Sequence, residues 1–214
     1  MSRDFREAFL NYVLKNSHSG DASSVINTID EYCWTQQALM NIGDGKGKIL
    51  DAALQSRQPK TVLELGTFLG YSSLRMASQL PEDTLIVTIE VNPESAATAR
   101  RIHEHAGVEN RIQIVLDQTD RAIPRLSKQF NVDSFDFIFI DHHKEAYLSD
   151  FKLLENVGLI NRGTMIVADN IIYPGAPDYA NYVRNNPHYT STFHESTLEY
   201  DKNIRDGVEV SIRQ

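Results

Sequence analysis

The sequence predicts one α/β domain with a mostly parallel β-sheet and helices on both of its faces. After Pro59, short apolar runs that end in polar residues alternate with segments of helical periodicity. Strands buried on both faces have this pattern, and helical crossovers between them make neighbouring strands parallel. Helical segments also precede the first strand. We therefore expect a single domain over residues 1–214, in which residues 1–57 form a helical appendage and residues 60–214 form the α/β core.

Each expected element follows from a local pattern. Apolar residues at helical spacing predict the helices, and runs of Ile, Val, Leu and Phe predict the strands. A glycine-rich break is expected at 41–47, and the last two strands are expected to pair as a long hairpin that completes a seven-stranded sheet. The expected helices are 3–16, 22–39, 48–54, 93–106 and 122–130, and the expected strands are 62–65, 85–90, 112–116, 135–141, 163–170, 188–193 and 207–212.

Composition restricts the class of protein. The net charge is −8 and the basic residues are scattered, which argues against nucleic acid or an anionic membrane as the main partner. The N-terminal residues alternate in charge and lead into no long apolar run, so neither a signal peptide nor a membrane span is expected. Cys33 is the single cysteine, so a reducing, cytoplasmic setting is the default expectation. We expect a small-molecule substrate and a monomer or weak homodimer.

The segment from Val62 to Ser73 predicts a strand, a tight turn and the start of a helix. Gly66 and Gly70 can adopt positive φ or let a ligand approach the backbone, and Ser72 or Ser73 can cap the helix. Free N–H groups at such a helix start often face a cofactor. Alternatively, the glycines only allow the chain to turn, since short βα loops are commonly rich in glycine.

Acidic residues end four of the expected strands, namely Glu64, Glu90, Asp141 and Asp169. Parallel strands bring their carboxyl ends to one edge of the sheet, where the ligands of such folds bind. Glu90 lies about twenty residues beyond the glycine turn, where an acid can accept hydrogen bonds from ribose hydroxyls. The alternative is that each acid only caps the helix that follows it.

The glycine spacing favours S-adenosylmethionine over a nicotinamide cofactor. A dinucleotide site has the pattern G-x-G-x-x-G, which lets the pyrophosphate touch the backbone. Here three residues separate Gly66 from Gly70, and Glu64 would be a poor neighbour for phosphates. The same carboxylate suits the positively charged sulfonium and ammonium groups of S-adenosylmethionine. The turn is therefore interpreted as a methyl-donor site.

Three oxygen ligands, from Asp141, Asp169 and Asn170, are expected on adjacent strands, which suits Mg²⁺. The histidine pair after Asp141 suggests zinc, but adjacent side chains diverge in an extended segment and no further Cys or His has zinc-ligand spacing. Lys144 follows closely. A neighbouring cation would favour its neutral form, which would make it a candidate general base.

Together, eight motifs resemble catechol O-methyltransferase, and the similarity extends over nearly the whole chain. The motifs are Met40–Asp44, Leu63–Gly66, Gly70–Ser72, Asp141–Lys144, Ala168–Asn170, Pro174–Asp178, Leu198–Tyr200 and Asp206–Gly207. The resemblance implies a Rossmann-like class I methyltransferase fold whose N-terminal helices cover the site. It also implies a magnesium-dependent transfer of a methyl group from S-adenosylmethionine to one hydroxyl of a catechol.

The resemblance assigns a role to each matching residue. Lys144 would remove a proton from one catechol hydroxyl, and Glu199 would hold the other. Asp141, Asp169 and Asn170 would hold the Mg²⁺ that binds both oxygens. The substrate wall would include Ala38, His143 and Pro174. The cofactor pocket would include Met40, Ile42, Glu64, Gly66, Phe68, Gly70, Ser72, Glu90, Val91, Thr119, Asp120, Asp141 and His142, the last of these near the adenine.

The chain departs from the family at some of these positions. Phe68 stands where the family usually has tyrosine, and Thr119-Asp120 replaces a Ser-Gln pair beside the adenine. A carboxylate oxygen can accept from the adenine amino group as an amide oxygen does. The two entrance tryptophans of the mammalian enzymes are replaced by Ala38 and His143. Larger vicinal diols, of caffeoyl or flavonoid type, are therefore the alternative substrates.

Trp34 offers a partial replacement for the aromatic ring missing at Ala38, because it is expected one helical turn earlier on the same face. Alternatively, Trp34 packs into the core. A non-catalytic S-adenosylmethionine-binding protein is a further alternative. Such a protein would have no chemical reason to keep Asp141, Lys144 and Glu199, so we expect an enzyme.

Overall fold

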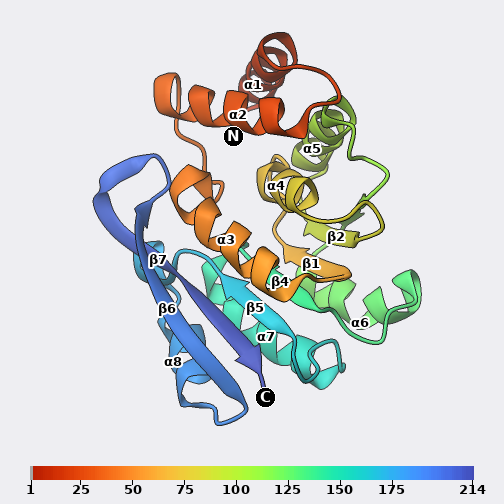
Figure 1. Ribbon diagram of the computed structural model, residues 1–214, viewed down its shortest axis with the longest axis vertical. Helices are drawn as coiled ribbons and strands as arrows, with labels where there is room; N and C mark the ends of the chain where they lie inside the picture. Colours follow the sequence, from red (N-terminus) through yellow and green to blue (C-terminus); the bar gives the residue numbers. More distant parts are fainter. Residues whose placement is uncertain (1) are drawn as a thin grey trace.

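The computed structural model describes residues 2–214 and arranges them around one seven-stranded sheet (Figure 1). The strand order is β3-β2-β1-β4-β5-β7-β6. Strands β1 to β5 pair in parallel, whereas β7 runs antiparallel to both β5 and β6. The predicted mostly parallel sheet with a C-terminal hairpin is confirmed. The strands are β1 (Thr61–Leu65), β2 (Leu85–Glu90), β3 (Ile112–Leu116), β4 (Phe137–Ile140), β5 (Met165–Ala168), β6 (Tyr189–Leu198) and β7 (Asp201–Arg213).

Helices cover both faces of the sheet, because alternate strand residues point into two separate apolar cores. Val62 packs with α1 to α5, and its neighbour Leu63 packs with α6 to α8. In Figure 1, α1 and α2 lie outside α4 and α5. The helices are α1 (Arg3–Asn16), α2 (Ala22–Thr35), α3 (Gly43–Arg57), α4 (Tyr71–Gln79), α5 (Pro93–Ala106), α6 (Thr119–Phe130), α7 (Tyr147–Asn156) and α8 (Pro177–Asn185), with short turns η1 (Lys144–Ala146) and η2 (Ile171–Gly175).

The predicted end of the second helix was wrong. Helix α2 ends at Thr35, where the Thr35 hydroxyl donates to the Glu31 carbonyl at 2.7 Å and the next two N–H groups both donate to Tyr32. Side-chain bonds of this kind compete with the helical backbone pattern. Ala38 therefore lies in a loop and does not share a helical face with Trp34.

The predicted glycine-rich break was also wrong, because most of it forms the start of α3. Gly43 adopts a φ of +69° and its N–H donates to the Asn41 side chain at 2.9 Å. A Cβ at Gly43 would lie 2.9 Å from the Glu199 Cβ, and one at Gly47 would lie 2.6 Å from the Arg75 guanidinium. These glycines therefore let α3 pack closely against its neighbours, including the turn that carries Glu199.

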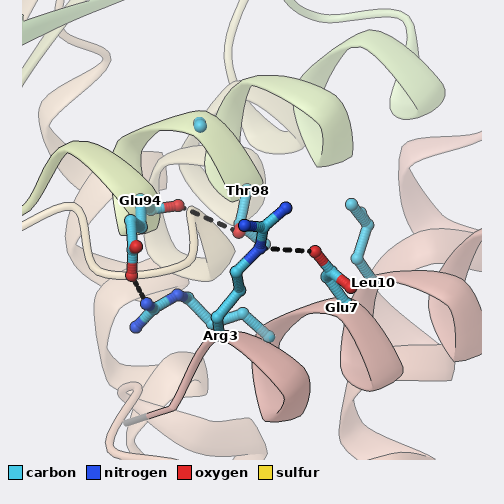
Figure 2. A pocket seen from close by; sticks show the side chains of 7 residues that line it. Arg3, Glu7, Leu10, Glu94 and Thr98 are labelled. Atoms are coloured by element: carbon cyan, nitrogen blue, oxygen red, sulfur yellow. Dashed lines mark hydrogen bonds and ion pairs between the residues drawn. The ribbon is translucent and has the colours of Figure 1, made fainter.

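A cavity of about 270 Å³ lies between α1 and α5 (Figure 2). Arg3 pairs with Glu7 at 2.9 Å on its α1 side, and Arg6 pairs with Glu94 across the helices. None of the residues that line it is a predicted site residue. The Arg6–Glu94 pair joins α1 to α5, whereas the Arg3–Glu7 pair lies within α1. Among the helices of residues 2–214, none is long and apolar enough to cross a membrane.

Candidate active site

The four strand-end acids lie on four neighbouring strands, as predicted. Glu64 is the second-last residue of β1 and Glu90 is the last of β2, while Asp141 and Asp169 directly follow β4 and β5. The Asp141 N–H donates to Leu65 O and the Asp169 N–H donates to Ile140 O, each at 3.0 Å. These backbone bonds continue the parallel ladder past the strands, so both carboxylates are held at one edge of the sheet.

The two glycines of the turn have different tasks. Both have positive φ, +99° at Gly66 and +86° at Gly70, as expected. A Cβ at Gly66 would lie 2.8 Å from the Asp141 carbonyl oxygen, so this glycine brings the turn against the end of β4. A Cβ at Gly70 would lie 2.6 Å from His103 Nε2 on α5. Gly70 thus serves the packing of α4 on α5.

The predicted serine cap was wrong. The residue that precedes α4 is Gly70, whose left-handed backbone makes the sharp turn without a side-chain cap. Ser72 and Ser73 lie inside the first turn of the helix and are buried. Ser73 Oγ donates to the Gly70 carbonyl at 3.2 Å. The side chain of Ser72 instead lies beside Glu64 and lowers its pKa.

Glu64 is fully buried and only partly satisfied. Thr88 Oγ1 donates to Glu64 Oε2 at 2.5 Å, while Glu64 Oε1 has no hydrogen-bond partner. Burial raises the pKa of Glu64 to about 8, although the hydrogen bonds from Ser72 and Thr88 oppose this. A cationic ligand group beside Oε1 would remove the cost of ionising this carboxyl group.

Glu90 is held in place by the backbone on both sides. The Phe68 N–H donates to Oε2 and the Asn92 N–H to Oε1, each at 2.8 Å. Phe68 reaches this position with a φ of +50°. Each carboxylate oxygen retains a lone pair, so both can accept a further hydrogen bond from a ligand.

The predicted adenine side is organised by a residue that the sequence analysis missed. Asp150 Oδ2, on α7, accepts a hydrogen bond from Thr119 Oγ1. The same oxygen lies 2.9 Å from His142 Nε2. The His142 ring stacks on Tyr147, and its buried Nδ1 has no partner. Asp120 is exposed. The structure therefore leaves one ring nitrogen of His142 for a ligand, while the Thr119 hydroxyl is already engaged.

The predicted apolar residues of the cofactor pocket differ in their exposure to solvent. Met40 is 74% exposed and Val91 is 62% exposed, which is unusual for large apolar residues. Ile42 is buried in the core, so its side chain does not line the pocket. Met40 and Val91 are available to cover a flat ligand, whereas Ile42 could offer only backbone groups.

The predicted metal ligands lie together with Lys144. Lys144 Nζ donates to Asp141 Oδ1 at 2.8 Å and to the Tyr147 hydroxyl at 2.7 Å. Asp169 is buried, its Oδ2 has no hydrogen-bond partner, and burial raises its pKa to about 7. Within residues 2–214 no three His, Cys, Asp or Glu side chains form a metal-binding group. The predicted set would need the Asn170 amide as its third ligand.

The sequence analysis missed the role of two buried residues behind this set, Lys46 and Asp206. Lys46 Nζ lies 2.9 Å from Asp169 Oδ1, 2.9 Å from Glu199 Oε2 and 2.8 Å from Asp206 Oδ2. The Asn170 amide nitrogen donates to Asp206 Oδ2 at 3.0 Å. Asp206 belongs to a motif of the resemblance, which was the available signal, whereas Lys46 follows the glycine pair that was expected to be a loop.

The predicted substrate wall is open. Ala38, His143 and Pro174 are all exposed, and the peptide bond before Pro174 is cis. Trp34 is 43% exposed, so it does not pack into the core. Its indole makes an edge contact with Tyr200, the residue after Glu199, with ring centroids 5.5 Å apart. A cavity of about 430 Å³ borders the wall at Ala38, Leu39 and Met40.

The fold and the row of strand-end acids define a Rossmann-like protein of the methyltransferase type. The structure resembles that of an O-methyltransferase from Bacillus cereus in complex with SAH, with a TM-score of 0.74 at 20% identity over 90% of each chain. It also resembles that of the methyltransferase PaMTH1 from Podospora anserina in its SAH-bound form, with a TM-score of 0.73 at 20% identity over 100% of this chain and 97% of the other. At this identity the likeness shows the fold alone.

Sequence comparison identifies the family. Residues 16–212 match the O-methyltransferase family. The chain is 43% identical to catechol O-methyltransferase B of Danio rerio, over 96% of this chain and 78% of the other. It is 42% identical to catechol O-methyltransferase of Bos taurus, over 98% of this chain and 76% of the other. The chain belongs to the O-methyltransferase family.

Proposed function

We propose that the protein transfers a methyl group from S-adenosylmethionine to one hydroxyl of a catechol, with Mg²⁺ in the site. The observation that carries the proposal is a group of buried, unpartnered atoms at the carboxyl ends of neighbouring strands. Glu64 Oε1, His142 Nδ1 and Asp169 Oδ2 are buried with no hydrogen-bond partner. Such atoms are costly unless a ligand satisfies them. The similarity to catechol O-methyltransferases supports the choice of substrate.

The donor half of the site suits S-adenosylmethionine. Glu64 Oε1 would accept from the ammonium group, and the two oxygens of Glu90 would accept from the ribose hydroxyls. His142 Nδ1 would meet the adenine, with Val91 and Met40 against its faces. Residues 66–70 of the glycine turn include no basic residue that would favour a pyrophosphate.

The acceptor half suits a divalent cation. Asp169 Oδ2, Asp141 and the Asn170 carbonyl oxygen would hold Mg²⁺, which prefers oxygen ligands and lowers the pKa of a hydroxyl bound to it. Lys144 Nζ, held between Asp141 and Tyr147, would accept the proton of one catechol hydroxyl. Glu199 would accept a hydrogen bond from the other. The surrounding residues hold the reacting oxygen in place and exclude water.

Methyl transfer is a simple exchange of bonds. The catechol oxygen forms a bond to the methyl carbon while the bond from that carbon to sulfur breaks, and the sulfonium becomes a neutral thioether. Negative and positive charges cancel in this step, so stabilising charge is less important than orientation.

The single buried cysteine, Cys33, forms no disulfide, which is compatible with a reducing, cytoplasmic setting.

The test is methyl transfer from labelled S-adenosylmethionine to dihydroxybenzoate, with Mg²⁺ and with EDTA. We expect product only with the metal. Product of equal amount in EDTA would refute the metal, and the absence of any product would refute the acceptor. The exposed Ala38 and His143 favour larger vicinal diols as the second candidate, so a caffeoyl ester is assayed in parallel. A higher kcat/KM for that ester would assign it as the substrate class.

A further inference from the structure

Lys46 is a buried lysine at the centre of the predicted acceptor site. Its side chain has no exposed surface, and its ammonium contacts three carboxylates, those of Asp169, Glu199 and Asp206, at 2.8 to 2.9 Å. It donates hydrogen bonds to Glu199 Oε2 and Asp206 Oδ2, and it forms an ion pair with Asp169 Oδ1. All three contacts are with acidic groups, which suit a positively charged side chain. The residue is therefore a fixed positive charge.

Asp206 completes the arrangement on the side away from the site. Its Oδ1 accepts the backbone N–H groups of Ile172 and Tyr173, each at 3.1 Å. Its Oδ2 accepts from Lys46 and from the Asn170 amide nitrogen. Because that nitrogen is engaged, the amide oxygen of Asn170 is the atom left for a ligand.

The formal charges of this cluster are uneven. Before a metal or a substrate binds, four carboxyl groups, those of Asp141, Asp169, Glu199 and Asp206, face two ammonium groups, those of Lys46 and Lys144, and Lys144 must lose its proton before it can act as a base. Two negative charges remain, which one divalent cation would neutralise. Lys46 thus supplies part of the positive charge that the buried carboxylates require. Its own charge also repels a metal cation that binds beside it.

We propose that Lys46 is a positioning residue that fixes Glu199 and, through its ion pair with Oδ1 of Asp169, makes Oδ2 the preferred oxygen for the metal. The inference rests on the proposed function. Lys46 occupies Asp169 Oδ1 and holds Glu199 Oε2, while Gly43 lets α3 approach the Glu199 backbone. The ammonium therefore lowers the affinity of the site for the cation, and in return it fixes the carboxylate that would hold the second catechol oxygen.

The proposal predicts effects of opposite sign in Lys46→Met. Loss of the ammonium group frees Asp169 Oδ1 and increases the negative charge, so the affinity for Mn²⁺, measured by electron paramagnetic resonance with S-adenosylhomocysteine present, should rise about tenfold. Because Glu199 is released, kcat for the catechol should fall about 100-fold. In a Glu199→Gln background the same substitution should cost less than about threefold in kcat, since the two residues act together.

Lys48→Met is the matched control, because Lys48 is exposed on the same helix. It should change neither quantity. Circular dichroism and S-adenosylhomocysteine binding report whether each variant is folded. Lys46→Gln, which retains a donor for Glu199, is the second variant if Lys46→Met does not fold, and it should give the same tighter Mn²⁺ binding with a smaller loss of kcat.

A parallel fall in Mn²⁺ affinity and kcat would assign Lys46 a purely structural role and overturn the proposal. No change in either quantity would overturn it as well. The wild-type protein separates these results from failure of the proposed function. If it forms no product while Mn²⁺ still binds more tightly to Lys46→Met, the acceptor is wrong and the metal-site role of Lys46 stands.

Discussion

Glu64 makes the stability of the unliganded protein fall as the pH rises. Its pKa is raised by burial from an ordinary 4.5 to about 8. A carboxyl group with a raised pKa in the folded state contributes stability that is fully present below the unfolded pKa and is lost as the pH passes through the folded pKa. A shift of this size corresponds to about 5 kcal/mol over the whole titration, or about 1.4 kcal/mol per pH unit between about pH 5 and pH 8.

Glu64→Gln isolates this contribution. The amide keeps an acceptor for the Thr88 hydroxyl and mimics the protonated acid without titrating. Urea denaturation from pH 5 to pH 8.5 should show similar stability for the two proteins at the acidic end. The variant should become progressively more stable than the wild type toward the alkaline end. Two curves that stay parallel over this range would refute the assignment of a neutral Glu64 to the folded protein.

The same argument applies to ligand binding. If the ammonium group of S-adenosylmethionine contacts Glu64 Oε1, binding at pH 7 should ionise the carboxyl group and release a proton. Calorimetry in buffers of different ionisation enthalpy measures this proton directly. The Glu64→Gln variant should release about one proton fewer. Equal proton release by both proteins would place the ammonium group elsewhere.

Three further substitutions test other parts of the site. Gly66→Ala should destabilise the protein by about 2–4 kcal/mol in urea denaturation, because Gly66 has a positive φ and lies against the end of β4. Gly158→Ala is the control, since Gly158 also has a positive φ but has open space around it, and it should cost about 1 kcal/mol. Lys144→Ala should lower kcat by at least about 100-fold with S-adenosylmethionine affinity retained; equal loss of both would indicate a structural lysine. Trp34→Ala should raise the catechol KM about threefold or more, since the indole adjoins Tyr200; an unchanged KM in the folded variant would exclude Trp34 from the wall.

The parts of the fold that local chemistry determines were predictable from the sequence. Strands β2 and β3 and helix α5 have the predicted boundaries. The two strands are rich in Ile, Val and Leu, and α5 starts at Pro93 after Asn92, whose side chain caps the first turn. The long C-terminal hairpin was predicted too short, because the polar residues near its turn are exposed and paired across the strands, as Glu195 is with Arg205.

The contacts of the site were less predictable, because long-range packing decides them. Lys46 lies 153 residues from Glu199 and 160 residues from Asp206 in the sequence. No local pattern shows that a lysine among glycines is buried, and the helix that carries it depends on packing against distant residues. The strand-end acids were predictable because parallel strands place them together whatever the details of packing.

The buried carboxyl groups of the proposed donor half and of the proposed acceptor half differ in their ionisation. This difference suggests how each ligand is selected. Glu64 has no basic partner, and burial favours its neutral form until a positively charged ligand arrives. Asp206, in contrast, has its pKa lowered by Lys46 despite its burial, so it stays ionised. In the proposed function, the donor half would therefore discriminate by the charge of the ligand, since a cation would make ionisation of Glu64 favourable. The acceptor half already holds ionised Asp206 beside Lys46, and the negative charge that remains would favour a divalent cation over a monovalent one.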